Sequence, residues 1–493
     1  MHYCIKITAL CLSFIISLSS LSYAAQTCPN PPDLPILNPQ CLPVEALTSG
    51  ELTECKKENS SISCQEIVDR FAWQLFIALN WPATSNGNPN SSAYFGEEGD
   101  TSPVIWETYK NVEDVFTQAV PSTWATKNKE KVLEATSATV HLTEILQVDR
   151  NWLTDQSGNL VYYELRINED EFDYIMDNTL YSQAGIYNAF TGIDPKGINL
   201  PSGEEPNTVG AIEIKAAWRI VPTDKEAYFK KRYKTSKALV GPNDDPHLVA
   251  LVGLHIIKKT PNLPQWTWST FEHIDNAPDV GSTAETAISY NFFSHNVAKQ
   301  DAKAKSVSDI YKPNYLSPPD KYATPPTPMT APVQMLRIDS IDTVDPHAAG
   351  ITNTALNLIK AKYPDSVWLN YQLISSQWPT EPQTLTFSAQ GSPLPAGTPA
   401  PEFLGNLTME SYFQEKKSGG GAGLTDGGGM ESGFTADNFN KSSCIGCHRL
   451  SATTPQFVDH PDAFWYTDYS SVFFKAQKHA STATHKKAMS PVK

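Results

Sequence analysis

The stretch that decides the fold is Val209-Gly-Ala-Ile-Glu-Ile-Lys-Ala-Ala-Trp-Arg-Ile-Val221, followed by His247-Leu-Val-Ala-Leu-Val-Gly-Leu-His-Ile-Ile-Lys258 and Gln265-Trp-Thr-Trp-Ser-Thr-Phe-Glu-His-Ile-Asp275. In the first and third runs polar and apolar residues alternate, which is typical of half-buried strands. The second run is apolar on both faces, as expected of a central strand. The connection between the second and third runs is short, so we expect these two to be neighbouring antiparallel strands.

Two further runs, Gly158–Asn168 and Val367–Ile374, also predict strands. A helix is predicted from Cys64 to Leu79, because Ser63-Cys-Gln-Glu66 forms a capping box and apolar residues follow at helical spacing. Asn80-Trp-Pro82 ends this helix.

The same spacing predicts a helix at Glu171–Phe190 and an amphipathic helix at Glu402–Gln414. Proline-rich stretches at 312–334 and 379–401, and a glycine-rich one at 418–433, indicate linkers or long surface loops. We therefore predict an α+β fold in which a large antiparallel β-rich domain with flanking helices covers 65–390. A small, mainly helical C-terminal segment, 402–493, is expected to pack on this domain.

Residues 1–24 have the features of a secretory signal peptide. Lys6 precedes an apolar run from Ile7 to Ile16, and Ser22-Tyr-Ala24 is a small-x-small cleavage site. The apolar run is too short to span a membrane. These features predict cleavage after Ala24 and a soluble protein that is periplasmic or secreted, with no integral membrane segment after cleavage.

The cysteines are distributed unevenly. Of the 8, two leave with the signal peptide and two lie near the C-terminus, while four crowd into the leader 25–64, namely Cys28, Cys41, Cys55 and Cys64. Clustered cysteines in an exported chain predict disulfides. Four allow three pairings, of which we favour the sequential one because short loops close easily. A zinc site is the alternative, but the spacings are irregular and no histidine is nearby.

The chain is acidic. Cleavage would remove one basic residue, Lys6, from the 38 Lys and Arg, so the mature chain would have 37 basic and 53 acidic residues, a net charge of −16. This charge argues against nucleic acid or an anionic membrane as a partner. A basic redox partner is compatible with it, although acidity also serves solubility.

The segment Ser443-Cys444-Ile-Gly-Cys447-His448-Arg449 contains Cys-x-x-Cys-His, the attachment sequence for haem c. Two thiols on one helical turn can add to the two vinyl groups of a porphyrin, and the following histidine can coordinate the iron. A zinc site would need two more ligands, and a thioredoxin-type pair would need a strand–turn–helix context. We therefore expect one covalent haem c, held by Cys444 and Cys447, with His448 as the proximal ligand.

The second axial ligand of the iron is left open by the sequence. Met489 is a candidate because it follows the motif, although its Lys-rich surroundings are typical of a frayed tail. The other candidates are His460, His479, His485 and Met409.

His255 and His273 are weak candidates for catalysis. They lie on the two runs expected to pair, so their imidazoles could line one cavity near the haem. By strand parity, His255 should share a face with Val249, Leu251 and Ile257. The alternative is that both are hydrogen-bonded core histidines.

Several segments together resemble a family of exported bacterial proteins described as "cytochrome c family protein". The segments are Phe71–Pro82, Trp106–Lys110, Gly253–Lys258, Trp266–Asn276, Asn370–Leu373, Gln377–Pro379, Met409–Tyr412, Asp468–Phe474 and the haem motif. The resemblance covers most of the mature chain. It implies export and haem c, but no established reaction or substrate.

These observations predict a periplasmic c-type cytochrome with one haem that transfers single electrons to or from a redox partner protein. The alternative is a haem-dependent oxidoreductase of peroxidase or oxygenase type, in which an open iron site meets a small-molecule substrate. A third possibility, a haem-based sensor, has no visible output domain.

Overall fold

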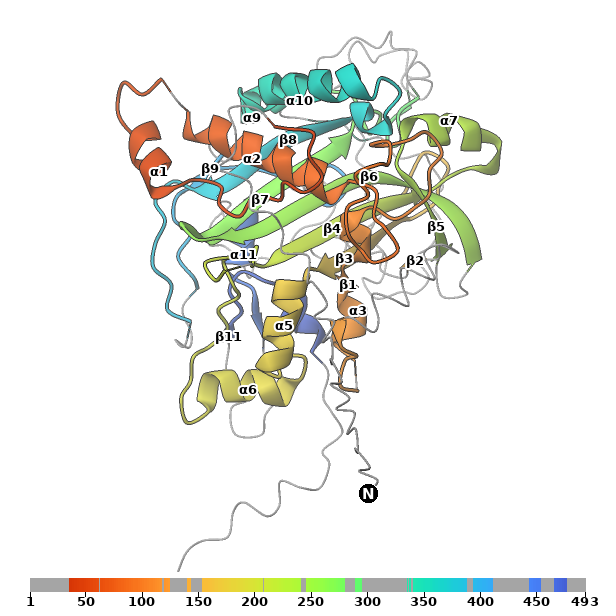
Figure 1. Cartoon of the computed structure of the whole chain (residues 1–493). Coiled ribbons are helices and arrows are strands. Elements are labelled where there is room, and N and C mark those ends of the chain that lie inside the picture. The colour runs from red at the N-terminus through yellow and green to blue at the C-terminus, as the bar shows by residue number, and fades with distance from the viewer. Residues whose placement is uncertain are drawn as a thin grey trace, which may run out of the picture.

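The computed structural model describes residues 35–61, 63–117, 119–124, 140–142, 153–206, 208–240, 245–279, 289–294, 335, 337, 340–387, 393–410, 443–453 and 465–476. The signal peptide predicted at 1–24, and Cys28, lie outside these residues. Figure 1 shows the arrangement, in which one large twisted sheet has helices on both faces. The structure is therefore mixed α and β, as predicted.

Within the described residues, nine strands form the sheet, in the order β1-β3-β4-β6-β7-β8-β9, with β5 also paired to β6, and β2 paired to β5. All pairs are antiparallel except β2 with β5. The strands are β1 (Lys110–Asn111), β2 (Val140–Leu142), β3 (Val161–Ile167), β4 (Ile212–Ile220), β5 (Thr235–Val240), β6 (Asp245–Thr260), β7 (Leu263–His273), β8 (Tyr371–Pro379) and β9 (Pro399–Ala400).

Strand β6 is the centre of this sheet. It is 16 residues long and pairs with β4, β5 and β7, which confirms both its predicted central place and its antiparallel pairing with β7. The register of β4 against β6 shifts where Ala217 pairs with Gly253 and Trp218 pairs with Leu251. Val252 is therefore an extra residue that reverses the side-chain alternation along β6.

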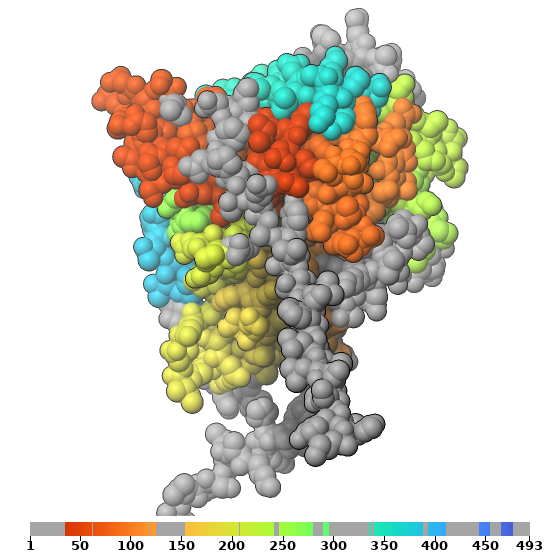
Figure 2. Space-filling model, viewed as in Figure 1, coloured from red at the N-terminus to blue at the C-terminus, as the bar shows by residue number. Residues whose placement is uncertain are grey.

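One face of the sheet is covered by α2 (Cys64–Leu79) and α10 (Ala348–Lys362) (Figure 1). The Ser63 hydroxyl accepts a hydrogen bond from the Glu66 backbone N–H, as the predicted cap requires, but the Glu66 carboxylate pairs with Arg70. Apolar side chains of both helices pack against Leu254, Ile256 and Phe271 in the largest core cluster. In the space-filling view α10, in cyan, lies at the top of the molecule (Figure 2).

The opposite face carries two separate apolar clusters. One contains Trp266 and Trp268 of β7 and is covered by helices and C-terminal residues, including α5 (Glu169–Asp177) and α11 (Cys444–His448). The other contains Ala250 and Val252 of β6 and is covered in part by Leu407 and Met409. Between them lie polar residues of the sheet, which the next subsection describes.

The remaining elements are short and connect or cover the sheet. They are α1 (Ser49–Cys55), η1 (Ile105–Thr108), α3 (Val112–Val115), α6 (Gln183–Thr191), η3 (Thr223–Lys225), α7 (Glu226–Arg232), α9 (Ile341–Val344), η5 (Val367–Asn370), β10 (Ala452–Thr453), β11 (Trp465–Tyr466) and η7 (Val472–Lys475).

Three predicted elements differ from the structure. The helix expected at Glu171–Phe190 is two helices, α5 and α6, separated near Thr179, which has a positive φ of 56°. The strand expected at Val367–Ile374 begins only at Tyr371 and continues to Pro379.

The helix expected at Glu402–Gln414 is not formed over its described residues, 402–410. Here the Asn406 side chain accepts hydrogen bonds from the Thr408 backbone N–H (2.8 Å) and hydroxyl (2.7 Å), and donates to Thr270 of β7 (2.8 Å). Such side-chain bonds to nearby backbone groups compete with a helix. The segment instead forms a tight turn on the sheet.

The leader is held by disulfides. Cys55 and Cys64 are bonded, with Cα atoms 5.2 Å apart, which confirms one half of the predicted pairing and ties α1 to α2. Cys41 is also disulfide-bonded. Within the described parts of the chain, no helix is long and apolar enough to cross a membrane.

The close packing of Asn406 and Thr408 on the sheet requires a glycine at position 253. A β-carbon added there would overlap the Thr408 hydroxyl and lie 3.1 Å from Asn406 Oδ1. Gly253→Ala should therefore destabilise the protein by about 1–3 kcal/mol through overpacking, measured by urea unfolding. The control is Gly350→Ala in α10, where the β-carbon meets nothing within 4 Å and should stabilise the helix by about 0.5–1 kcal/mol. Equal effects at the two sites would contradict the close packing at Gly253.

Candidate functional site

The Cys-x-x-Cys-His motif forms a short helix, α11 (Cys444–His448), anchored on the sheet. The Ser443 hydroxyl caps it by accepting a hydrogen bond from the Gly446 backbone N–H at 3.0 Å. Gln377 of β8 holds the start of the helix, because its Oε1 accepts from the Ser443 hydroxyl at 3.0 Å and from the Ile445 N–H at 2.9 Å. Ile445 is fully buried, so the motif has a fixed position on the sheet.

His448 is oriented by a backbone carbonyl. Its Nδ1 lies 2.8 Å from the Tyr469 carbonyl oxygen, which can only accept, so Nδ1 carries the proton and Nε2 keeps its lone pair. Its ring also packs against Trp268, with ring centroids 4.4 Å apart. Enclosure by the protein lowers the pKa of His448 to about 4, although the hydrogen bond to Tyr469 opposes this shift. A neutral imidazole with one nitrogen held by a carbonyl is the usual arrangement of a metal-ligating histidine.

The carbonyl of Tyr469 is presented by a strained turn. Asp468 and Tyr469 both have positive φ, 53° and 65°, which non-glycine residues adopt at an energetic cost. The buried Asp468 carboxylate holds the turn by accepting from the Leu200 N–H at 2.7 Å and from Lys259 Nζ at 2.6 Å. The backbone group that fixes the His448 tautomer is thus itself fixed by buried contacts.

The two motif thiols lie three residues apart on the same short helix, which places them on adjacent sides of one turn. Both cysteines are half-buried thiols. Burial raises the pKa of Cys444 well above its usual value, with a further contribution from the Glu410 carboxylate, so this group is a protonated thiol at neutral pH. Two neighbouring thiols beside an oriented, neutral imidazole fit the covalent attachment of haem c.

A histidine–glutamate pair lies near the motif. His255 Nε2 is 3.0 Å from Glu410 Oε1, and Lys215 is the neighbour of His255 across β4 and β6. Burial raises the pKa of Glu410, but His255, Lys215 and the Asn406 N–H together lower it below its usual value, so Glu410 is a carboxylate. Lys215, Glu410 and His255 all influence the pKa of His448, which places the three within electrostatic range of the motif.

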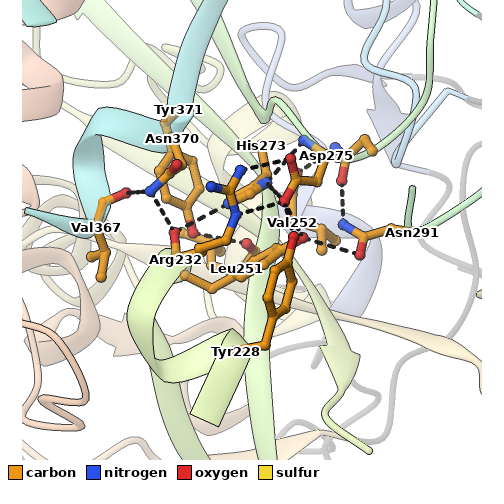
Figure 3. Close-up of polar contacts among 12 residues, drawn as sticks. Tyr228, Arg232, Leu251, Val252, His273, Asp275, Asn291, Val367, Asn370 and Tyr371 are labelled. Atoms are coloured by element: carbon orange, nitrogen blue, oxygen red, sulfur yellow. Dashed lines mark hydrogen bonds and ion pairs between the residues drawn. The ribbon is translucent and has the colours of Figure 1, made fainter. Parts of the chain in front are cut away.

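His273 lies in a different network, shown in Figure 3. Its Nε2 is 3.1 Å from the Arg232 carbonyl oxygen, and its Nδ1 accepts from the Asp275 N–H at 3.0 Å. Its ring stacks on Tyr233, with centroids 3.6 Å apart. Burial lowers the pKa of His273 to about 3, so it is a neutral core residue with both nitrogens hydrogen-bonded.

The prediction that His255 and His273 could line one cavity is therefore wrong. The strands pair as expected, but His255 lies opposite Thr270, so His273 points to the other face of the sheet. The parity expected for His255 is wrong in part as well. Because of the bulge at Val252, Val249 and Leu251 lie in the core under α2, whereas Ile257 belongs to the cluster of the motif.

Of the candidates for the second axial ligand, the described residues include only Met409, which does not pack with the motif helix. Met409 is fully buried in the cluster with Ala250 and Val252, whereas Ile445 of the motif helix belongs to the other cluster. Met489, His460, His479 and His485 lie outside the described residues. Among the residues that the structure describes, no group of three or more His, Cys, Asp or Glu side chains could hold a metal ion by itself.

The sequence did not identify the roles of Gln377, Tyr469, Trp268 and Glu410. Tyr469 acts through its backbone carbonyl, which no side-chain pattern reveals. Gln377 and Trp268 could have been found from the sequence, because they lie in two of the segments that carry the resemblance, Gln377–Pro379 and Trp266–Asn276.

No protein-family model matches the chain, and neither a curated protein nor a solved structure shows a significant match to it. The resemblance to exported cytochrome c family proteins therefore stays a prediction.

Gln377 offers a test of how the motif is anchored. Gln377→Met keeps the side-chain volume but leaves the buried Ile445 N–H without its acceptor, so unfolding free energy should fall by about 1–3 kcal/mol. Amide hydrogen exchange at Ile445 should become faster. The control, Gln372→Met on the same strand, removes a half-buried amide that is not bonded to the motif and should change stability by less than about 0.5 kcal/mol. Unchanged exchange at Ile445 would show that Gln377 does not hold the helix.

Proposed function

We propose that this chain is an exported c-type cytochrome with one covalent haem, which carries single electrons to and from a redox partner protein. The observation that carries the proposal is the hydrogen bond between His448 Nδ1 and the Tyr469 carbonyl, which leaves Nε2 available beside two neighbouring thiols. The predicted signal peptide supports export to the periplasm, where such attachment takes place. The acidic sequence is compatible with a basic partner.

Each residue of the site would have a separate role. Cys444 and Cys447 would hold the porphyrin through thioether bonds, and His448 would be the proximal iron ligand. The chemistry that a bound haem c supplies is one-electron transfer at iron. Gln377 and Ser443 fix the helix that carries these residues, while Tyr469 and Trp268 fix the plane of the imidazole. A rigid attachment keeps structural change during electron transfer small.

Covalent attachment is tested by replacing the thiols. The double variant Cys444→Ser with Cys447→Ser, expressed together with the haem-attachment machinery, should contain no covalent haem. No haem should therefore remain on the protein after acidic extraction. Each single variant should keep one thioether at most, with a shifted absorption band. The control is Ser451→Ala, which leaves both thiols in place. Retention of a two-thioether spectrum in the double variant would refute the proposal.

The second candidate is a haem-dependent oxidoreductase of peroxidase or oxygenase type acting on a small-molecule substrate. The pair His255–Glu410 favours it, because an imidazole bonded to a half-buried carboxylate near the motif could donate or accept a proton. The two candidates differ in whether the iron has an open coordination site.

Absorption spectra of the oxidised, reduced and carbon-monoxide-treated holoprotein separate them. In an electron carrier the iron should be low-spin and should not bind carbon monoxide, because both axial positions would be occupied. An enzyme should be high-spin and bind the gas at once. His255→Gln should leave a carrier's spectrum unchanged, whereas in an enzyme it should slow peroxide turnover by about 10²–10⁴-fold. High-spin iron that binds carbon monoxide would contradict the carrier.

A further inference from the structure

Three buried carboxyl groups meet behind the turn that holds His448. They are Glu171 of α5, Glu213 of β4 and Asp468 of the turn, with exposed fractions of 0, 2 and 0%. Asp468 forms an ion pair with Lys259, whose Nζ lies 2.6 Å away. No donor group in the described part of the chain bonds to either oxygen of Glu171 or to Oε1 of Glu213. The surroundings therefore do not compensate the negative charge that Glu171 and Glu213 would have if both were ionised.

The contact between Glu171 and Glu213 requires a proton. Two carboxylates only accept hydrogen bonds, so they can bond to each other only when one of them is protonated. Burial raises the pKa of both, that of Glu213 to about 7, and the negative charge of Asp468 adds to the shift. Glu171, which has no neutralising partner, keeps the proton and donates it to Glu213. The pair thus holds one proton, and a second binds near neutral pH.

This acid pair adjoins the motif through two routes. Glu213 accepts a hydrogen bond from Ser470, the residue after Tyr469, whose carbonyl holds His448. Across the sheet, Glu213 pairs with Ile257 and Ile257 pairs with Trp268, which packs on the His448 ring. Because adjacent strands are about 4.8 Å apart, Glu213 lies about 10 Å from the Trp268 backbone.

The other charged groups near the pair face elsewhere. Asp170 of α5 accepts from the Val209 and Gly210 N–H groups and is attracted by Lys258 of β6. Glu169 of the same helix is only half-buried and is influenced by Asp173, Asp170 and Lys110 rather than by Asp468. Asp468, Lys259 and Ser470 are therefore the groups that set the charge around the acid pair.

We propose that Glu171 and Glu213 form a proton-binding site that takes up one proton from water when the motif-bound iron accepts one electron from the redox partner. The proposal rests on the proposed function. The iron loses one positive charge on reduction, the carboxylate of the pair gains one proton, and reoxidation reverses both steps. At an effective dielectric constant of about 20, a unit charge changes the proton affinity of a carboxylate about tenfold at a separation of about 12 Å.

The test is the midpoint potential of the full-length holoprotein between pH 5 and 9. A tenfold difference in proton affinity corresponds to a total fall of about 59 mV from the low-pH to the high-pH plateau. Glu213→Gln should flatten this dependence, because it removes the carboxylate that takes the second proton. Glu171→Gln should keep it, because a neutral amide replaces the protonated acid and Glu213 can still bind a proton. The infrared difference spectrum of reduced minus oxidised protein should show a new carboxylic-acid C=O band, which should be absent in Glu213→Gln and retained in Glu171→Gln.

Glu169→Gln is the matched control, because the pKa of Glu169 is also raised to about 7 on the same helix. It should leave the potential and its pH dependence unchanged. A wild-type potential that does not vary with pH, or a variation that survives in Glu213→Gln, would overturn the proposal. So would a redox difference spectrum without a carboxylic-acid band, a measurement that needs no variant. Loss of covalent haem from the wild type would instead refute the proposed function.

Discussion

Strand β6 must be covered on both faces, and the rest of the molecule follows from this requirement. The strand carries apolar side chains on both sides and pairs with β4, β5 and β7, so water has to be excluded above and below it. Helices α2 and α10 cover one face. The second face is covered by segments from distant parts of the chain, including α5 and the C-terminal residues around α11. The motif therefore lies on a rigid platform.

The second face also holds charges that are costly to bury. Arg337 pairs with Glu272 at 2.6 Å, and Lys259 pairs with Asp468 at the same distance. Such pairs contribute little net stability because their desolvation offsets the attraction, but removing one partner is strongly destabilising. Both carboxylates also accept a backbone N–H, that of Leu407 and that of Leu200 respectively. These pairs therefore specify where two irregular segments sit on the sheet.

The sequence predicted the regular elements well because their patterns are local. The alternation in β4 and β7, the apolar run of β6 and the cap at Ser63 each lie within a short window. It failed where a long-range contact or one backbone residue decides the structure. The extra residue Val252 reverses the parity of β6, and the Asn406 side chain replaces a helical turn with contacts to β7. Neither Val252 nor Asn406 lies in a sequence pattern that would distinguish its segment from a regular strand or helix.

The sequence also predicts the chemistry of the motif only in part. Its residue types identify two thiols and an imidazole, whereas the tautomer of His448 depends on the carbonyl of Tyr469, a group that every residue possesses. The face of the sheet then decides which histidine could take part. His255 shares the side of Trp268 and Thr270 with the motif, whereas His273 is enclosed between Tyr233 and Tyr371 on the other side. Strand parity, corrected for one bulge, thus separates the histidine that can influence the motif from the one that stabilises the core.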